Sequence, residues 1–134
     1  MKLTRRYRFC ASHRLDVPQL SAEENRRLYG KCNNPYGHGH DYVLDVTVEG
    51  PIDETGQVAD RAKLDEWVNS RVLQRIDHKN LSKEVEGLKD SVATTENLAK
   101  LIGDSLRADW PLSARLKKVR IMETDRNIFV LEMA

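Results

Sequence analysis

Three histidines in this sequence have the spacing of metal ligands. His38 and His40 are separated by one residue, and His13 precedes them. Residues two apart in a strand project from one face, about 6.5–7 Å apart. Three imidazoles without a fourth protein ligand are typical of a catalytic zinc site, where the fourth position is open to water or substrate. The alternative is that the histidines are structural and satisfied by hydrogen bonds, and spacing alone leaves both interpretations open.

Two cysteines accompany the histidines. Cys32 lies six residues before His38. It could be a fourth zinc ligand, a small buried hydrophobe, or a general base whose thiol pKa is lowered by positive charge from Lys31 or the metal. Cys10 stands at the strand position opposite to that of Phe9 and Ala11, so it is expected to take no part in the chemistry.

Three further residues could move protons or hold a ligand. Asp77 and His78 follow a predicted helix, so His78 is either a helix-terminal residue near the negative end of the dipole or one half of an Asp–His pair for proton transfer. Glu123 shares its strand parity with Ile121 and is expected to point inward. A buried carboxylate needs a cationic or multi-donor partner, which could be an arginine of the chain or a guanidine-like ligand edge.

The strands that position the histidines are predicted by a hydropathy period of two. One covers residues 3–13, with Arg5 as an exception on its apolar face, and another begins at His38 and ends before Gly50-Pro51. If the two strands pair antiparallel, the end of the first lies near the start of the second. The three imidazoles then converge at one end of a sheet, on its buried face.

The remaining elements complete an α+β pattern. Residues 14–31 read as a long loop with a helical turn at 22–28. Asp60 is a predicted N-cap of a helix to about Arg75, and Thr94 or Thr95 caps a second helix. Strands at 116–123 and 128–133 enclose a tight turn. The order is strand, strand, helix, helix, strand, strand (ββααββ), and its exposed sheet edges favour a homo-oligomer with joined sheets.

Length and composition limit the possible functions. A chain of 134 residues fits a single domain, residues 1–134, and is too short for a complete (β/α)₈ barrel of about 250 residues, which disfavours a His-x-His metallohydrolase. With 22 Lys+Arg against 21 Asp+Glu, neither a nucleic-acid nor a membrane partner is expected. No membrane span or signal peptide is visible, and two cysteines form no disulfide framework, so we expect a cytoplasmic protein.

Several motifs together resemble the 6-pyruvoyl-tetrahydropterin synthase family, and they follow one another along nearly the whole chain. They are Phe9-x-Ala11-Ser12-His13-Arg14-Leu15, Tyr29-Gly30-Lys31-Cys32-Asn33-Asn34-Pro35-x-Gly37-His38-Gly39-His40-x-Tyr42, Asp77-His78-Lys79-Asn80-Leu81, Thr94-Thr95-Glu96-Asn97 and Glu123-Thr124-x-x-Asn127. The sequence departs from the family at Asp41, where Asn is common, and at the variable position of Tyr36.

This resemblance implies the tunnelling fold, a four-stranded antiparallel sheet with two helices on one face. Trimers of such chains join their sheets into a β-barrel, and two trimers form a hexamer. It also implies Zn²⁺ on His13, His38 and His40. The implied reaction converts 7,8-dihydroneopterin triphosphate to 6-pyruvoyl-tetrahydropterin and eliminates triphosphate.

The resemblance also implies roles for the other residues. Glu123 would anchor the guanidine-like edge of the pterin, helped by the turn Thr94-Thr95-Glu96. Cys32 would act as general base, and His78, paired with Asp77, would be a second proton carrier donated by a neighbouring subunit. By their proximity to the motifs, the candidates for binding the triphosphate are Arg14, Lys31 and Lys79.

Two alternatives remain within this resemblance. One branch makes 6-carboxy-tetrahydropterin for queuosine biosynthesis, and its Cys commonly lies four residues before the His-Gly-His. The interval of six from Cys32 to His38 favours the pyruvoyl branch, and the presence of Cys32 argues against a branch that replaces it with Glu. The other alternative is a non-catalytic pterin- or metal-binding relative, which would have no need of both Cys32 and His78.

Overall fold

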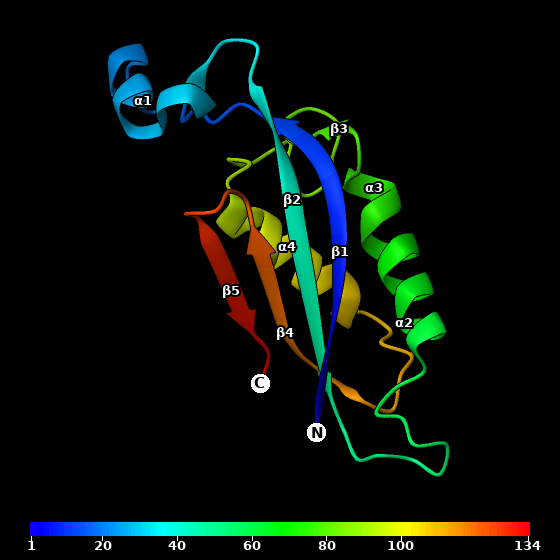
Figure 1. Cartoon of the computed structure of the whole chain (residues 1–134). Coiled ribbons are helices and arrows are strands. Elements are labelled where there is room, and N and C mark those ends of the chain that lie inside the picture. Colours follow the sequence, from blue (N-terminus) through cyan, green and yellow to red (C-terminus); the bar gives the residue numbers. More distant parts are fainter.

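The computed structural model describes all 134 residues. Its backbone forms one five-stranded sheet with helices packed on it, so the α+β class is as predicted (Figure 1). The strands are β1 (Lys2–His13), β2 (His38–Glu49), β3 (Lys79–Asn80), β4 (Arg115–Met122) and β5 (Ile128–Glu132). The helical segments are α1 (Ala22–Tyr29), the 3₁₀ turn η1 (Gly30–Asn33), α2 (Arg61–Val68), the π-helical η2 (Asn69–Leu73), α3 (Gln74–Ile76) and α4 (Thr95–Arg107).

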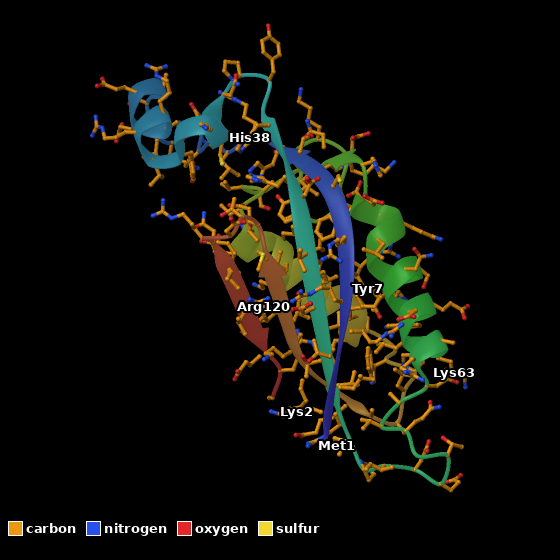
Figure 2. The ribbon with its side chains drawn as sticks, in the orientation of Figure 1. Met1, Lys2, Tyr7, His38, Lys63 and Arg120 are labelled. Atoms are coloured by element: carbon orange, nitrogen blue, oxygen red, sulfur yellow. The ribbon has the colours of Figure 1, made fainter.

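The sheet has the order β3-β1-β2-β4-β5. β1 and β2 pair antiparallel over their full lengths, from Lys2 opposite Glu49 to His13 opposite His38. The predicted antiparallel pairing is therefore confirmed. Figure 2 shows the consequence: His38 lies at one end of the sheet and Met1 at the other.

One face of the sheet carries the core, because the apolar positions of the strands alternate as the period of two predicts. Leu44, Val46 and Val48 of β2 are fully buried there, and the helices contribute Leu64 and Leu98. α2, α3 and α4 all lie on this face, whereas α1 lies beyond the end of the sheet (Figure 1). The inward-facing Arg5 is explained by α2, because its guanidinium donates two hydrogen bonds to Asp65.

The helix starts follow from their capping residues. Asp60 caps α2 by accepting a hydrogen bond from Lys63 N, as predicted, and Thr94 rather than Thr95 caps α4 by accepting one from Asn97 N. The helix predicted to about Arg75 continues as α2, η2 and α3 to Ile76.

Two expectations need correction. The sheet has five strands rather than four, because two residues after His78 pair in parallel with β1 as β3. The segment expected to be a loop with one helical turn holds the full helix α1, stabilised by a capping box between Ser21 and Glu24. None of the helices is both long enough and apolar enough to span a membrane.

Candidate functional site

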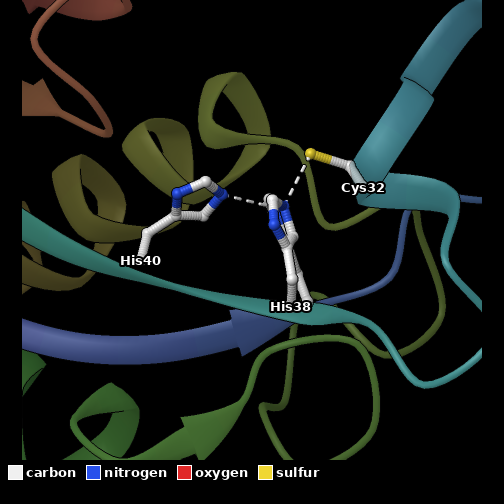
Figure 3. A group of neighbouring side chains, drawn as sticks. Cys32, His38 and His40 are labelled. Atoms are coloured by element: carbon white, nitrogen blue, oxygen red, sulfur yellow. Dashed lines mark hydrogen bonds between the residues drawn. The ribbon is translucent and has the colours of Figure 1, made fainter.

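The predicted convergence of the histidines is present at the end of the sheet. One donor atom from each of His13, Cys32, His38 and His40 lies within 4.8 Å of every other. Cys32 Sγ is 3.0 Å from His38 Nε2, and His40 Nε2 is 3.2 Å from His13 Nε2. Figure 3 shows that Cys32 comes from the helical turn before β2, while His38 and His40 project side by side from β2 itself.

One of these distances has the value expected for two ligands of a tetrahedral metal ion. Two nitrogens that lie 2.0–2.1 Å from one zinc at tetrahedral angles are about 3.3 Å apart. The separation of 3.2 Å between His13 Nε2 and His40 Nε2 is close to that value. Three imidazoles and one thiol are also the donors that zinc prefers. The four side chains could therefore hold a metal ion, either with all four donors or with the three imidazoles alone.

The start of α4 and the residues just before it orient two parts of the site. Nδ1 of the fully buried His13 lies 3.0 Å from the carbonyl oxygen of Ala93. As donor to this carbonyl, Nδ1 keeps the proton of the neutral ring and leaves the Nε2 lone pair free for a metal. Two residues later, the Thr95 hydroxyl donates to Oε2 of Glu123. Ala93 was not predictable from sequence, because a backbone carbonyl has no sequence signature.

The loop between α1 and β2 brings Cys32 to the histidines. Leu15 N donates to the Cys32 carbonyl at 2.6 Å, and the buried Asn33 amide donates to the Leu15 carbonyl at 2.7 Å. Gly37 has φ of +74°, and a Cβ on it would lie 2.6 Å from the His13 carbonyl oxygen. Only glycine fits this position, so Gly37 permits the close approach that places His38 beside His13.

Burial shifts the pKa values of three residues of the cluster. It lowers the pKa of His13 and of His40, and this effect outweighs the attraction of the Glu123 carboxylate for the charged imidazoles. Neutral imidazoles are the form that binds metals. Burial also raises the pKa of the Cys32 thiol, and Glu123 adds to the rise. Cys32 would therefore need nearby positive charge, such as that of a bound metal, to act as a base.

Glu123 faces the same side of the sheet as the cluster. It follows β4 directly and is half-buried. One carboxylate oxygen accepts from Thr95, and the other receives a long hydrogen bond of 3.4 Å from Asn127. Of the two partners expected from the sequence, the arginine of the chain is absent: none pairs with Glu123.

Asp77 and His78 form a pair beside Cys10. His78 Nδ1 lies 3.1 Å from Asp77 Oδ1, and the same oxygen accepts a hydrogen bond from Cys10 N. The exposed His78 lines a cleft of about 450 Å³ with Cys10 and Asp41 of the outward face, and the lining includes His40 of the cluster but not Cys32. Within one chain, the structure therefore does not bring His78 together with Cys32.

Cys10 lies where its strand parity predicted, exposed on the outward face. Its thiol donates to Asp41 Oδ1 at 2.9 Å, and this carboxylate raises the pKa of Cys10. A thiol with a raised pKa is a weaker nucleophile at neutral pH.

The three triphosphate candidates are also divided. Arg14 N donates to Ser82 Oγ, and its guanidinium lies 3.5 Å from Asp16. Lys31 is exposed in η1 next to Cys32, whereas Lys79 lines the cleft on the outward face. Arg14 and Lys31 are therefore sequence neighbours of the cluster residues His13 and Cys32, whereas Lys79 is not.

One residue of the site was not assigned a role from sequence. Tyr42 takes the next inward position on β2 after His38 and His40, and its ring lies edge-on to His40 with centroids 5.5 Å apart. Burial raises its pKa, and Glu123 raises it further. Its position in the sequence could have indicated this, because Tyr42 lies an even number of residues after His38 and His40 and so faces the same side of the strand.

Known proteins share both the sequence and the fold of this chain. The model of the 6-pyruvoyl tetrahydropterin synthase family matches residues 2–133. The 6-pyruvoyl tetrahydrobiopterin synthases of Homo sapiens and Drosophila melanogaster are each 48% identical to it; the matches cover 96% and 94% of this chain, and 89% and 76% of those proteins. The structure of Caenorhabditis elegans 6-pyruvoyl tetrahydropterin synthase matches with a TM-score of 0.90 and 41% identity, covering 100% of this chain and 96% of that one.

The sheet with its helices on one face and the cluster at its end define an α+β protein with a potential metal site. The family match covers nearly the whole chain, so the chain belongs to the 6-pyruvoyl tetrahydropterin synthase family. It is an enzyme of the lyase type, and the resemblance stated from the motifs is confirmed.

Proposed function

We propose that the chain is a zinc-dependent lyase that converts 7,8-dihydroneopterin triphosphate to 6-pyruvoyl-tetrahydropterin and eliminates triphosphate. The observation that carries the proposal is the set of four donors from His13, Cys32, His38 and His40 within 4.8 Å, on the same face as a carboxylate without an arginine partner. In this arrangement one end of the substrate can meet the cluster while the pterin ring reaches Glu123.

Within the site, His13, His38 and His40 would hold the ion. A bound zinc supplies Lewis-acid polarisation of the side-chain oxygens, which makes the adjacent carbon–hydrogen bonds more acidic. The lowered pKa of His13 and its hydrogen bond to the Ala93 carbonyl support this assignment. The Cys32 thiol, close to His38, would be the base rather than a permanent fourth ligand, since a catalytic site needs an open position.

Residues of the chain itself would transfer the protons and bind the pterin ring. Cys32 removes protons from the side-chain carbons and returns them, and the hydrogens lost there reappear on the ring and on the new methyl group. The reaction therefore balances without an external oxidant or reductant, and triphosphate leaves from the terminal carbon. Glu123 accepts hydrogen bonds from the guanidine-like edge of the pterin, with Thr94, Thr95 and Glu96 around it. The triphosphate candidates are Arg14, Lys31 and Lys79.

The position of His78 supports a site shared between copies of the chain. Asp77 and His78 lie over the outward face of β1, away from Cys32 of their own chain, so they would complete the site of a neighbour. The edge strand β5 exposes Ile128 and Val130, with 41% and 54% of their surface accessible, which favours pairing with another sheet. We therefore propose a homo-oligomer with joined sheets, expected to be a hexamer of two trimers.

The six-residue interval between Cys32 and His38, filled by η1 and the turn ending at Gly37, favours the pyruvoyl product over the 6-carboxy product. The test of catalysis compares metal-free and zinc-loaded protein with 7,8-dihydroneopterin triphosphate. We expect triphosphate release only with zinc. If the zinc-loaded protein released none, the non-catalytic alternative would replace the proposal.

A further inference from the structure

The hydroxyl group of Tyr42 is buried and has no hydrogen-bond partner. Only 1% of the surface of this residue is exposed. A buried hydroxyl without a partner destabilises the folded chain, because it has given up its bonds to water. Phenylalanine would fill the same space without this cost, so the hydroxyl calls for a role outside the packing of the free chain.

Tyr42 lies between the two halves of the proposed site. Its ring is stacked on Phe9 with centroids 4.7 Å apart and lies edge-on to His40. Val43 pairs with Met122, so the next pair along these antiparallel strands places Tyr42 at the level of Glu123. The ring is thus fixed by packing, and the residue connects the cluster with the carboxylate.

Glu123 lies opposite Tyr42 across the two strands, and Thr95 is hydrogen-bonded to Glu123 on the same face of the sheet. Thr95 is 1% exposed and uses its proton to bond Glu123. Its oxygen still has a free lone pair, which can accept a hydrogen bond from Tyr42. A hydrogen bond from Tyr42 to this oxygen makes the Thr95 hydroxyl a stronger donor to Glu123, because hydrogen bonds in a chain strengthen one another.

We propose that Tyr42 is a positioning residue of the pterin site: when a ligand binds Glu123, the Tyr42 hydroxyl donates to Thr95. Tyr42, Thr95 and Glu123 then form one hydrogen-bonded chain that fixes the orientation of the carboxylate. This inference rests on the proposed role of Glu123 as the anchor of the pterin. Because the anchor holds the ring equally in the ground state and the transition state, its loss raises KM and leaves kcat nearly unchanged.

The test uses Tyr42→Phe, with Tyr7→Phe as the matched control. The Tyr7 hydroxyl donates to Asp65 at 2.7 Å, on the same face but next to α2. The probe for binding is 7,8-dihydroneopterin, whose affinity for the zinc-loaded protein is measured by its fluorescence. For Tyr42→Phe we expect binding about threefold to tenfold weaker, the range of one neutral hydrogen bond. KM for the triphosphate should rise by the same factor, with an unchanged or higher unfolding temperature.

The control and a double variant separate this role from packing. Tyr7→Phe should lower the unfolding temperature and leave probe binding unchanged. Tyr42→Phe should have no further effect on binding in a Thr95→Val background, because the two hydroxyls act in one chain. The proposal is overturned if Tyr42→Phe binds the probe like the wild type, if its loss of binding accompanies a lowered unfolding temperature, or if the two substitutions act independently.

The outcome also separates this proposal from the proposed function. A wild-type protein that binds 7,8-dihydroneopterin but releases no triphosphate overturns the proposed function alone, and the probe affinities still decide the role of Tyr42. A wild-type protein that binds no probe overturns both.

Discussion

Replacement of Cys32 by alanine separates its two possible roles at the cluster. Its Sγ lies 3.0 Å from His38 Nε2, close enough to coordinate the same ion or to act as a base beside it. If Cys32 is the base, Cys32→Ala retains three imidazole ligands, so one zinc per chain remains bound. The loss of a positioned general base lowers kcat by about 10²–10⁴. Because the thiol is half-buried and small, the loss of stability is expected to be only about 1 kcal/mol.

The assay combines zinc content after dialysis against a competing chelator with the rate of triphosphate release at saturating substrate. His38→Ala is the matched control, because it removes a ligand and should lose both metal and activity. A Cys32→Ala protein with wild-type kcat would refute the assignment of the base. Loss of zinc affinity by more than about 100-fold, beyond what a group that only supports a ligand contributes, would instead make Cys32 a ligand.

Three further outcomes are expected. Arg6 and Arg120 pair with Asp45 and lower its pKa. The stability that these ion pairs contribute is present above the unfolded-state pKa of Asp45 and is lost as the pH falls through its lower folded-state pKa. Asp45→Asn should therefore lower the free energy of unfolding, measured in urea at pH 7, by about 1–3 kcal/mol, and the variant should lose no further stability from this site in acid. Thr95→Val should raise KM by about 10-fold or more with unchanged zinc content, since a hydrogen bond to a charged group is lost; an unchanged KM would argue against Glu123 as anchor. His78→Ala should be inactive alone, and co-refolding it with inactive Cys32→Ala should restore part of the activity if sites are shared; no recovery in a mixed oligomer would contradict sharing.

The strand parities were predictable from sequence because a strand alternates its faces with a period of two. The facing of His13, His38 and His40 follows from that period together with antiparallel pairing, and the register of β1 with β2 bears it out. The Ser21–Glu24 capping box was also visible as a Ser-x-x-Glu pattern, although its helix is too polar to show an apolar stripe.

The remaining features depend on contacts that local sequence does not encode. β3 has only two residues and exists because the chain after His78 meets the edge of β1. The Ala93 carbonyl is positioned by the start of α4, and any residue could supply it. The outward location of His78 follows from its φ of +61° and its backbone hydrogen bond to Cys10, neither of which has a periodic signal.

The proposed conversion of 7,8-dihydroneopterin triphosphate to 6-pyruvoyl-tetrahydropterin is decided by mass spectrometry of the product formed by the zinc-loaded oligomer. We expect a mass equal to the substrate minus triphosphoric acid, with no small aldehyde released. A 6-carboxy-tetrahydropterin together with acetaldehyde would contradict it and assign the chain to the other branch of the family.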